Sequence, residues 1–394
     1  MVSYQLAPEQ QDLRDSVAQF AREVVAPVIG GYYERGEFPY DIVARMGKLG
    51  LFGLPFPEEY GGMGGDYFAL CLALEELARV DSSVAITLEA GVSLGAMPIY
   101  RFGTPEQRRR WLPELCAGDR LAAFGLTEPG GGSDIPGAMR TTARLVTGDG
   151  EGGGEAKWVV DGTKAFITNS GTAITSLVTV LAITGHDERG RKEISSIIIP
   201  NGTSGFVPGQ EYSKVGWCAS DTRELSFSGC RVPAENLLGE RGRGYAQFLQ
   251  ILDEGRVALA ALATGLAQGC VDECVRSASQ REAFGRRLEA HQAIQFVIAD
   301  MEVRAHGARL AWYDAAARLV AGQPIKKESA IAKLTASNAA MDNARAATQV
   351  FGGYGFMNES AVGRFYRDAK VLEIGEGTSE IQRMLIAREL GLRS

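Results

Sequence analysis

One carboxylate near the C-terminus lies in a setting that suits proton-transfer chemistry. The segment LEIGEGTSEIQR places Glu376 between Gly375 and Gly377. Flanking glycines let the backbone approach a ligand closely and leave the carboxylate uncrowded, which is how a general base is presented. Ser379 and Gln382 have the spacing of a capping box, so a helix is expected to begin directly after the glutamate. An ordinary loop has the same pattern, so the catalytic interpretation depends on the rest of the chain.

Further glycine-bearing segments could surround a ligand. FGLTEPGGGSD at 124–134 forms a loop whose backbone amides can face an anion, although it is neither a GxGxxG nor a Walker A sequence. KAFITNSG at 164–171 and QVFGGYG at 349–355 add aromatic, hydroxyl and amide side chains. REAFG at 281–285 adds an arginine, which suits a diphosphate. Taken singly, each is equally explained as a surface turn, a solvated arginine or a core phenylalanine.

Composition narrows the class of protein. The chain has 394 residues, of which 45% are hydrophobic and 23% charged, enough for two or three globular domains. Its net charge of −7 does not indicate the excess of basic residues that binding to a polyanion requires, so nucleic acid is not an expected partner. We find no run of the about 18–20 apolar residues that a membrane span needs, and no secretory or transit signal. The sequence therefore predicts a cytoplasmic protein without a membrane span.

Cysteine and histidine give little support for a metal site. None of the six cysteines forms a CxxC pair, and Cys270 and Cys274, one helical turn apart, have no histidine nearby in the sequence. With only three histidines, and with neither HExxH nor GxSxG, zinc and serine hydrolases are unsupported. We expect small buried thiols and no metal.

The order of elements predicts helices, then a β domain, then helices. Apolar residues at 13, 17, 20 and 24 follow one helical face after Pro8, and 67–80 is a second helical run. Short apolar or β-branched stretches predict strands at 176–184, 195–200 and 224–228. WVVDG at 158–162 is typical of a strand that enters a hairpin turn, and 148–155 of a flexible loop.

The last third predicts a helical bundle. Long alanine-rich helices are expected at 245–280, 291–321 and 326–350, the last ending at the glycine pair 352–353. The expected fold is α+β, with an N-terminal helical domain at 1–120, a middle β domain at 121–235 and a C-terminal four-helix bundle at 236–394.

These segments together resemble the acyl-CoA dehydrogenase family over essentially the whole chain. The resemblance is carried by FGLTEPGGGSD, KAFITN, GWCASDTRELSFSGCRVP, LDEGR, REAFG with Gln292, QVFGGYGF and RDAKVLEIGEGTSEIQR, in family order and at family spacing. It implies the three-domain fold above, an FAD cofactor and an acyl-CoA substrate.

The resemblance assigns residues to each part of the site. Contacts with FAD are implied for Phe124, Leu126, Thr127, Gly132, Ser133, Phe166, Thr168, Thr378 and Glu380. Contacts with the FAD of a neighbouring subunit are implied for Arg281, Phe284, Gln292, Gln349, Gly352 and Gly353. Substrate contacts are implied for Ser133, Tyr245, Asp253, Arg256 and Gly377. A site shared between subunits requires at least a dimer, and the long apolar helices of the bundle could pack two dimers together, so a homotetramer organised as a dimer of dimers is expected.

Glu376 matches the family's catalytic base. It would take the α-proton of an acyl-CoA while the β-hydride goes to N5 of FAD, giving the trans-2-enoyl-CoA. Isovaleryl-type relatives carry the base on the LDxxR helix, where this chain has Gly255. Many relatives have tyrosine at Gly375 and tryptophan at Phe166. Glutaryl-type enzymes have an arginine where this chain has Ala85, so glutaryl-CoA decarboxylation is not expected.

The resemblance leaves more than one function open. Electron-transferring flavoprotein is the expected electron acceptor, but an acyl-CoA oxidase or a dehydrogenase specific for an acyl-carrier protein has the same motifs. A non-catalytic flavin or acyl-CoA binding protein is a further alternative, against which Glu376 argues. Chain length is not recorded by any motif, but Gly375 favours short or branched acyl groups because it leaves room beside the base.

Overall fold

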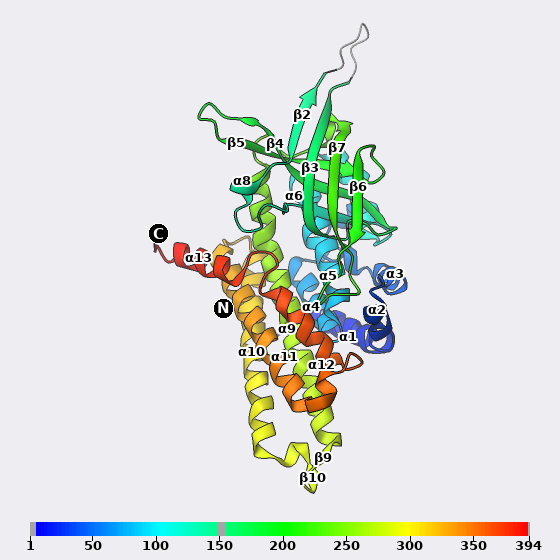
Figure 1. The fold of residues 1–394 in the computed structure, drawn as a ribbon, viewed down its shortest axis with the longest axis vertical. Helices are drawn as coiled ribbons and strands as arrows, with labels where there is room; N and C mark the ends of the chain where they lie inside the picture. Colours follow the sequence, from blue (N-terminus) through cyan, green and yellow to red (C-terminus); the bar gives the residue numbers. More distant parts are fainter. Residues whose placement is uncertain (1–4, 148–154, 393–394) are drawn as a thin grey trace.

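The computed structural model describes residues 5–147 and 155–392. It confirms the predicted α+β class: helices, then a central sheet, then helices (Figure 1). The long helices match the sequence pattern to within a few residues at each end. Of the loop predicted at 148–155, all but the last residue lies outside the described residues.

The N-terminal region is helical and is held by capped helix starts. Asp66 and Asp81 accept backbone hydrogen bonds at the starts of two helices, and Thr104 forms a capping box with Gln107 at a third. The helices are α1 (Pro8–Phe20), the π-helical η1 (Ala21–Val25), α2 (Ile29–Arg35), α3 (Tyr40–Lys48), η2 (Leu51–Gly53), η3 (Glu58–Tyr60), α4 (Tyr67–Ala78), α5 (Ser82–Glu89), the π-helical η4 (Ala90–Ala96), α6 (Met97–Phe102) and α7 (Pro105–Cys116).

The β domain is one mixed sheet with the strand order β6-β7-β3-β2-β4-β5-β8, and β1 pairs with β4 in parallel. Its elements are β1 (Leu121–Gly125), α8 (Ile135–Ala138), β2 (Thr142–Val146), β3 (Lys157–Thr168), β4 (Thr175–His186), β5 (Lys192–Pro200), β6 (Phe206–Glu211), β7 (Thr222–Pro233), η5 (Ala234–Asn236) and β8 (Leu237–Leu238).

The hairpin turn predicted at Asp161-Gly162 is wrong, because β3 continues through both residues to Thr168. A Cβ atom at Gly162 would lie 2.5 Å from Oγ1 of Thr141, the residue just before the neighbouring strand β2. The Asp161 carboxylate accepts a hydrogen bond from the backbone N–H of Gly229 at 2.6 Å. The glycine therefore marks a close approach between strands, where sequence alone suggests a turn.

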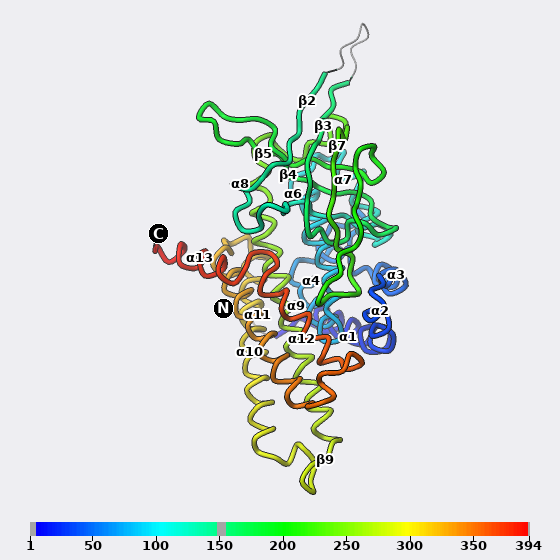
Figure 2. The backbone as a smooth tube through the Cα atoms, viewed as in Figure 1, coloured from blue at the N-terminus to red at the C-terminus, as the bar shows by residue number. Residues whose placement is uncertain are grey.

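The C-terminal helices form an elongated bundle (Figure 2). Helices α9, α10 and α11 pack against one another, and α12 packs on α9 and α11. The elements are α9 (Gly244–Gln280), β9 (Glu282–Ala283), β10 (Arg286–Arg287), η6 (Leu288–Ala290), α10 (Gln292–Val320), α11 (Lys326–Phe351), η7 (Gly352–Phe356), α12 (Ala361–Leu372) and α13 (Ser379–Glu389).

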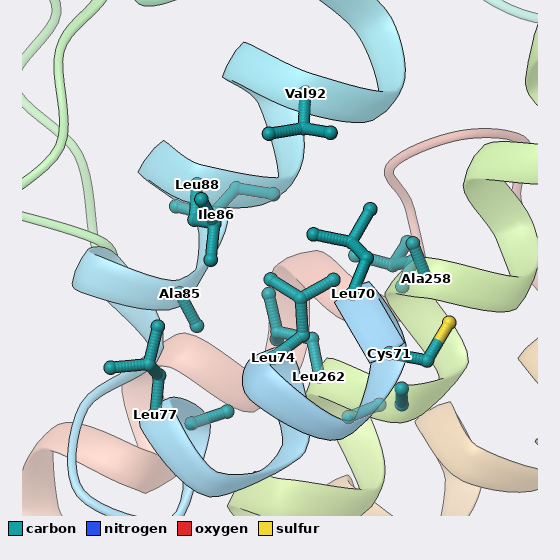
Figure 3. Close-up of a cluster of buried hydrophobic side chains, with 14 of the residues drawn as sticks. Leu70, Cys71, Leu74, Leu77, Ala85, Ile86, Leu88, Val92, Ala258 and Leu262 are labelled. Carbon is teal, nitrogen blue, oxygen red and sulfur yellow. The ribbon is translucent and has the colours of Figure 1, made fainter. Parts of the chain in front are cut away.

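The N-terminal helices and the bundle share one hydrophobic core. Leu70 and Leu74 of α4 pack against Ala258 and Leu262 of α9, with side chains of α5 closing one side (Figure 3). Five of the six cysteines are buried as free thiols, and Cys71 lies within this core. This packing fixes α5 and its continuation η4 against the middle of α9, where the site described below lies.

Two helical segments are long and apolar enough to be membrane-spanning candidates. They are Ser82–Phe102 and Gly244–Gln280, and 94% and 89% of their apolar windows are buried inside the protein. Core helices of folded proteins pass the same test, and the burial of both segments agrees with that interpretation.

Candidate active site

The loop between α12 and α13 presents Glu376 in an unusual backbone conformation. Glu376 has a φ of 52°, in the left-handed region that residues other than glycine seldom adopt. Its carbonyl accepts hydrogen bonds from Arg256 Nε at 3.2 Å and from Gln382 Nε2 at 3.3 Å. The next carbonyl, of Gly377, accepts from Lys333 Nζ at 2.9 Å and from Gln382 Nε2 at 2.8 Å. Three side chains from three helices thus hold the strained backbone in place.

The carboxyl group of Glu376 points into the protein. Both of its oxygens are buried, and neither has a well-oriented hydrogen-bond donor among the described residues. One oxygen occupies the space beside Gly255, where a Cβ atom would lie 2.6 Å from it. Burial raises the pKa of Glu376 to about 7, against the opposing effect of Arg256 and Lys333. A carboxylate with so high a pKa can accept a proton near neutral pH.

A helix begins directly after the glutamate loop, as predicted, but the capping box predicted at Ser379 and Gln382 does not form. Thr378 is the N-cap of α13, and its hydroxyl accepts a hydrogen bond from the N–H of Ile381 at 3.4 Å. Ser379 is the first residue of the helix and is buried. Gln382 turns back to the carbonyls of the Glu376 loop, where it positions the predicted base. Glu380 is exposed in the first turn.

Lys333 is a site residue that the sequence analysis missed. It lies on α11, it is 1% exposed, and burial lowers its pKa to about 8. No feature of the sequence marks Lys333, because its burial and its hydrogen bond to the Gly377 carbonyl appear only in the folded chain. Arg256, predicted to face the substrate, pairs with Asp253 at 2.5 Å and donates a hydrogen bond to the Glu376 carbonyl. Tyr245 is half-buried near the start of α9.

The predicted flavin strand lies at the edge of the β domain next to α9. Phe124 stacks on Phe248 of α9, with ring centroids 3.8 Å apart and an interplanar angle of 19°. Leu126 is almost fully buried, whereas Thr127 is partly exposed and its carbonyl accepts the N–H of Ala165 at 2.9 Å.

A buried ion pair fixes the loop that follows. Lys164 Nζ lies 2.8 Å from the Glu128 carboxylate and donates to the carbonyl of Leu126 at 3.2 Å. Both residues belong to the motifs FGLTEPGGGSD and KAFITN, but no pattern in the sequence pairs them. Beyond this pair, Gly132 and Ser133 are exposed, and a Cβ atom at Gly132 would meet nothing within 4 Å.

Phe166 is presented to solvent by left-handed backbone. Its φ is 61°, its side chain is 66% exposed, and its ring lies 5.3 Å from that of Tyr212. Thr168 follows at the end of β3 and is half-buried. Asn169, also left-handed, is buried and donates to the Thr87 carbonyl at 3.0 Å. The strand end therefore offers an aromatic plane on a rigid support.

The remaining predicted cofactor residues lie at the other end of the molecule, near β9 and β10 (Figure 1). Arg281 donates to the Phe351 carbonyl at 2.6 Å, beside Gly352. Phe284 has a φ of 54° and is 97% exposed. The exposed residues Gln292, Gln349 and Gly353 complete this group. Within one chain, the structure does not bring this group to the Glu376 loop.

Comparison with known proteins gives one family for the whole chain. Family models match at 7–119 (Acyl-CoA dehydrogenase, N-terminal domain), 123–230 (middle domain) and 242–391 (C-terminal domain). The probable acyl-CoA dehydrogenase YngJ of Bacillus subtilis is 44% identical over 389 residues, covering 99% of this chain and 100% of that protein.

Two further relatives point to short acyl chains as substrates of those proteins. The mitochondrial short-chain specific acyl-CoA dehydrogenase of Rattus norvegicus is 42% identical, covering 100% of this chain and 92% of that protein. The structure of butyryl-CoA dehydrogenase from Megasphaera elsdenii superposes with a TM-score of 0.92 at 39% identity, covering 98% of this chain and 99% of that chain. Identity over the full length, the shared fold and the matched domains agree: the chain belongs to the acyl-CoA dehydrogenase family of oxidoreductases.

Proposed function

We propose that the protein is an FAD-dependent acyl-CoA dehydrogenase that converts a short-chain acyl-CoA to its trans-2-enoyl-CoA, with Glu376 as the base. The observation that carries the proposal is the Glu376 carboxyl group, buried without a well-oriented donor beside Gly255. Such a group is costly for stability and has a raised pKa, which makes it a candidate for function.

The chain's own residues prepare the removal of the α-proton. Glu376 accepts that proton on a carboxylate oxygen, and its burial keeps water away from the carboxylate. Arg256, Gln382 and Lys333 fix the carbonyls of the loop, so the backbone N–H of Glu376 keeps one orientation and can stabilise charge on the thioester oxygen. FAD, when bound, supplies the oxidising power by accepting the β-hydride.

The β-domain residues fit a planar cofactor. Phe166 offers an exposed aromatic face, and the open loop at Gly132 and Ser133 leaves space for a diphosphate. Thr127 and Thr168 are partly exposed beside them. We propose that Thr378 and Glu380 contribute to the adenosine diphosphate side.

Anaerobic titration of the purified protein with butyryl-CoA tests the proposed function. Stoichiometric bleaching of the flavin, with crotonyl-CoA as the product, is the expected result. Oxygen consumption with the same substrate would identify an oxidase instead, and reoxidation by electron-transferring flavoprotein identifies the proposed acceptor. A protein that binds butyryl-CoA without bleaching would contradict the proposal.

We expect one FAD per chain and a homotetramer built as a dimer of dimers. Arg281, Phe284 and Gly352 lie too far along the bundle to reach the β-domain residues of their own chain, so they are available to the FAD of a neighbouring chain (Figure 1). Light scattering with simultaneous flavin absorbance measures both quantities. A flavin-saturated monomer would refute the shared site.

Short or branched acyl-CoAs should be better substrates than long ones. A Cβ atom at Gly375 would meet only the Val371 carbonyl, at 3.5 Å, so no described side chain fills the place where many relatives carry tyrosine. A methyl branch then fits without the overpacking that costs about 1–3 kcal/mol. The measurement is kcat/KM for butyryl-, isobutyryl-, 2-methylbutyryl-, isovaleryl-, octanoyl- and palmitoyl-CoA.

Gly375→Tyr provides the matched control for this preference, since it restores the side chain common among relatives. It should lower kcat/KM for branched substrates more than for butyryl-CoA. A preference for palmitoyl-CoA, or an unchanged branched-to-straight ratio in Gly375→Tyr, would rule out the explanation.

A further inference from the structure

A second carboxyl group, that of Glu89, is buried next to the proposed base. Glu89 is the last residue of α5, where the helix continues into the π-helical turn η4. Its side chain is 0% exposed. Turns of this kind are rare within α-helices and are frequent at functional sites. A fully buried acid is costly unless another group compensates for it, and the mechanism described above leaves it unused.

The carboxyl group of Glu89 lies within hydrogen-bonding reach of that of Glu376. None of their four oxygens has a well-oriented hydrogen-bond donor among the described residues. Two ionised carboxylates repel each other at this range, whereas a carboxylic acid bonds strongly to a carboxylate. The pair is therefore compatible with the fold if it holds one proton.

The carboxyl group of Glu376 also lies beside residues of η4 and α9. At Gly255 of α9, the position of a Cβ atom lies 2.6 Å from Glu376 Oε2 and 3.4 Å from Leu94 of η4. Gly255 and Leu94 therefore border the carboxyl group of Glu376 without a polar side chain. Neither neighbour can donate a hydrogen bond from its side chain.

The surrounding charges decide which carboxyl group holds the proton. Burial is the largest effect on the pKa of Glu89, and the neighbouring Glu376 carboxyl group raises it further. The Ser93 hydroxyl lowers it, but the net effect raises the pKa of Glu89 well above its usual range. The two cations, Arg256 of α9 and Lys333 of α11, act on Glu376. The other titratable groups near the pair are Tyr67 and Cys71 of α4 and Glu254 of α9. The cations therefore favour an ionised Glu376 and leave Glu89 with the proton.

We infer that Glu89 is a positioning residue: it stays protonated and donates a hydrogen bond to the carboxylate of Glu376. This inference rests on the proposed function, in which Glu376 must be ionised to act. The bond orients the carboxylate and stabilises its charged form, so that the base becomes available at a lower pH. The proton on Glu89 is not consumed, because the α-proton of the substrate goes to Glu376.

The test compares the pH dependence of kcat/KM for butyryl-CoA in the wild type, Glu89→Gln and Glu89→Leu. Wild-type activity should fall as the pH drops through about 7, because Glu376 becomes protonated. The glutamine amide still donates a hydrogen bond, so Glu89→Gln should keep this acidic limb in place. Leucine cannot donate, so Glu89→Leu should move the limb up by about one to two pH units, the usual worth of a hydrogen bond to a charged group.

Infrared spectroscopy of the protein without substrate gives a readout independent of turnover. The wild type at pH 8 should show the C=O stretch of a protonated carboxylic acid, and Glu89→Gln should lack it. An unchanged band in Glu89→Gln, or equal shifts of the acidic limb in both variants, or no shift in Glu89→Leu, would overturn the inference.

These outcomes are separable from failure of the proposed function. If the wild type does not dehydrogenate acyl-CoAs, the proposed function fails, while the infrared comparison still decides whether Glu89 holds a proton. If Glu89→Leu does not fold, the infrared band and the limb of Glu89→Gln decide the question.

Discussion

Replacing Glu376 by glutamine should abolish turnover while leaving the protein folded, yellow and able to bind acyl-CoA. The amide has nearly the same size and shape, so it can occupy the space beside Gly255 without displacing the loop. It cannot accept a proton, and a general base is typically worth about 10²–10⁴-fold in rate. Steady-state kcat with butyryl-CoA and electron-transferring flavoprotein is the measurement. Isovaleryl-type relatives carry their base at the position of Gly255, and glycine has no side chain that could replace the lost carboxylate.

The matched control is Glu373→Gln on the same loop. Glu373 is half-buried, and its carboxylate pairs with Lys370 at 2.7 Å at the surface. Its replacement should leave kcat close to the wild-type value, because it neither borders Gly255 nor supports the loop carbonyls. If Glu376→Gln keeps a tenth or more of wild-type activity, the base lies elsewhere.

Replacing Asp368 by alanine should cost about 3–5 kcal/mol in the free energy of unfolding. Its buried carboxylate accepts hydrogen bonds from the Tyr33 hydroxyl at 2.6 Å, the Ser82 hydroxyl at 2.7 Å and the Trp217 backbone N–H at 2.7 Å. These donors come from α2, α5 and the loop before β7, so one side chain joins the N-terminal helices, the β domain and α12. Alanine would leave all three donors buried without a partner.

Asp368→Asn is the control for this prediction. Asparagine keeps one acceptor for Tyr33 and Trp217, and its amide can donate to the Ser82 oxygen, so the expected loss is about 1–2 kcal/mol. Urea denaturation followed by tryptophan fluorescence measures both variants. A stability of Asp368→Ala within about 1 kcal/mol of the wild type would show that the donors find other partners.

Periodicity predicted the elements well because long helices record their buried face in the sequence. The helix predicted at 326–350 is observed at Lys326–Phe351, and the one at 245–280 begins one residue earlier. Local turn signals were less reliable. The Asp161-Gly162 pair suggests a hairpin, but the contact that requires glycine is made by Thr141, which lies outside the local motif and is brought close by the pairing of β2 with β3.

The site was predictable where one motif contains the chemistry and was not where tertiary contacts create it. Glu376 stands out from its two flanking glycines. Lys333 and Glu89 do not, because each acquires its role from a loop that only the fold brings near. Gln382 lies in the same motif as Glu376, but its contact with the loop carbonyls depends on how the chain turns back before α13. The Glu128–Lys164 ion pair likewise joins two motifs that the sequence presents separately.

The most direct test of the central claim follows proton removal alone. An acyl-CoA analogue without β-hydrogens cannot transfer a hydride, yet its α-hydrogen can still exchange with D2O if a base is present. The exchange rate at the α-carbon, followed by mass spectrometry, should be at least about 100-fold slower in Glu376→Gln than in the wild type. Exchange in Glu376→Gln within tenfold of the wild-type rate would contradict the assignment of Glu376 as the base.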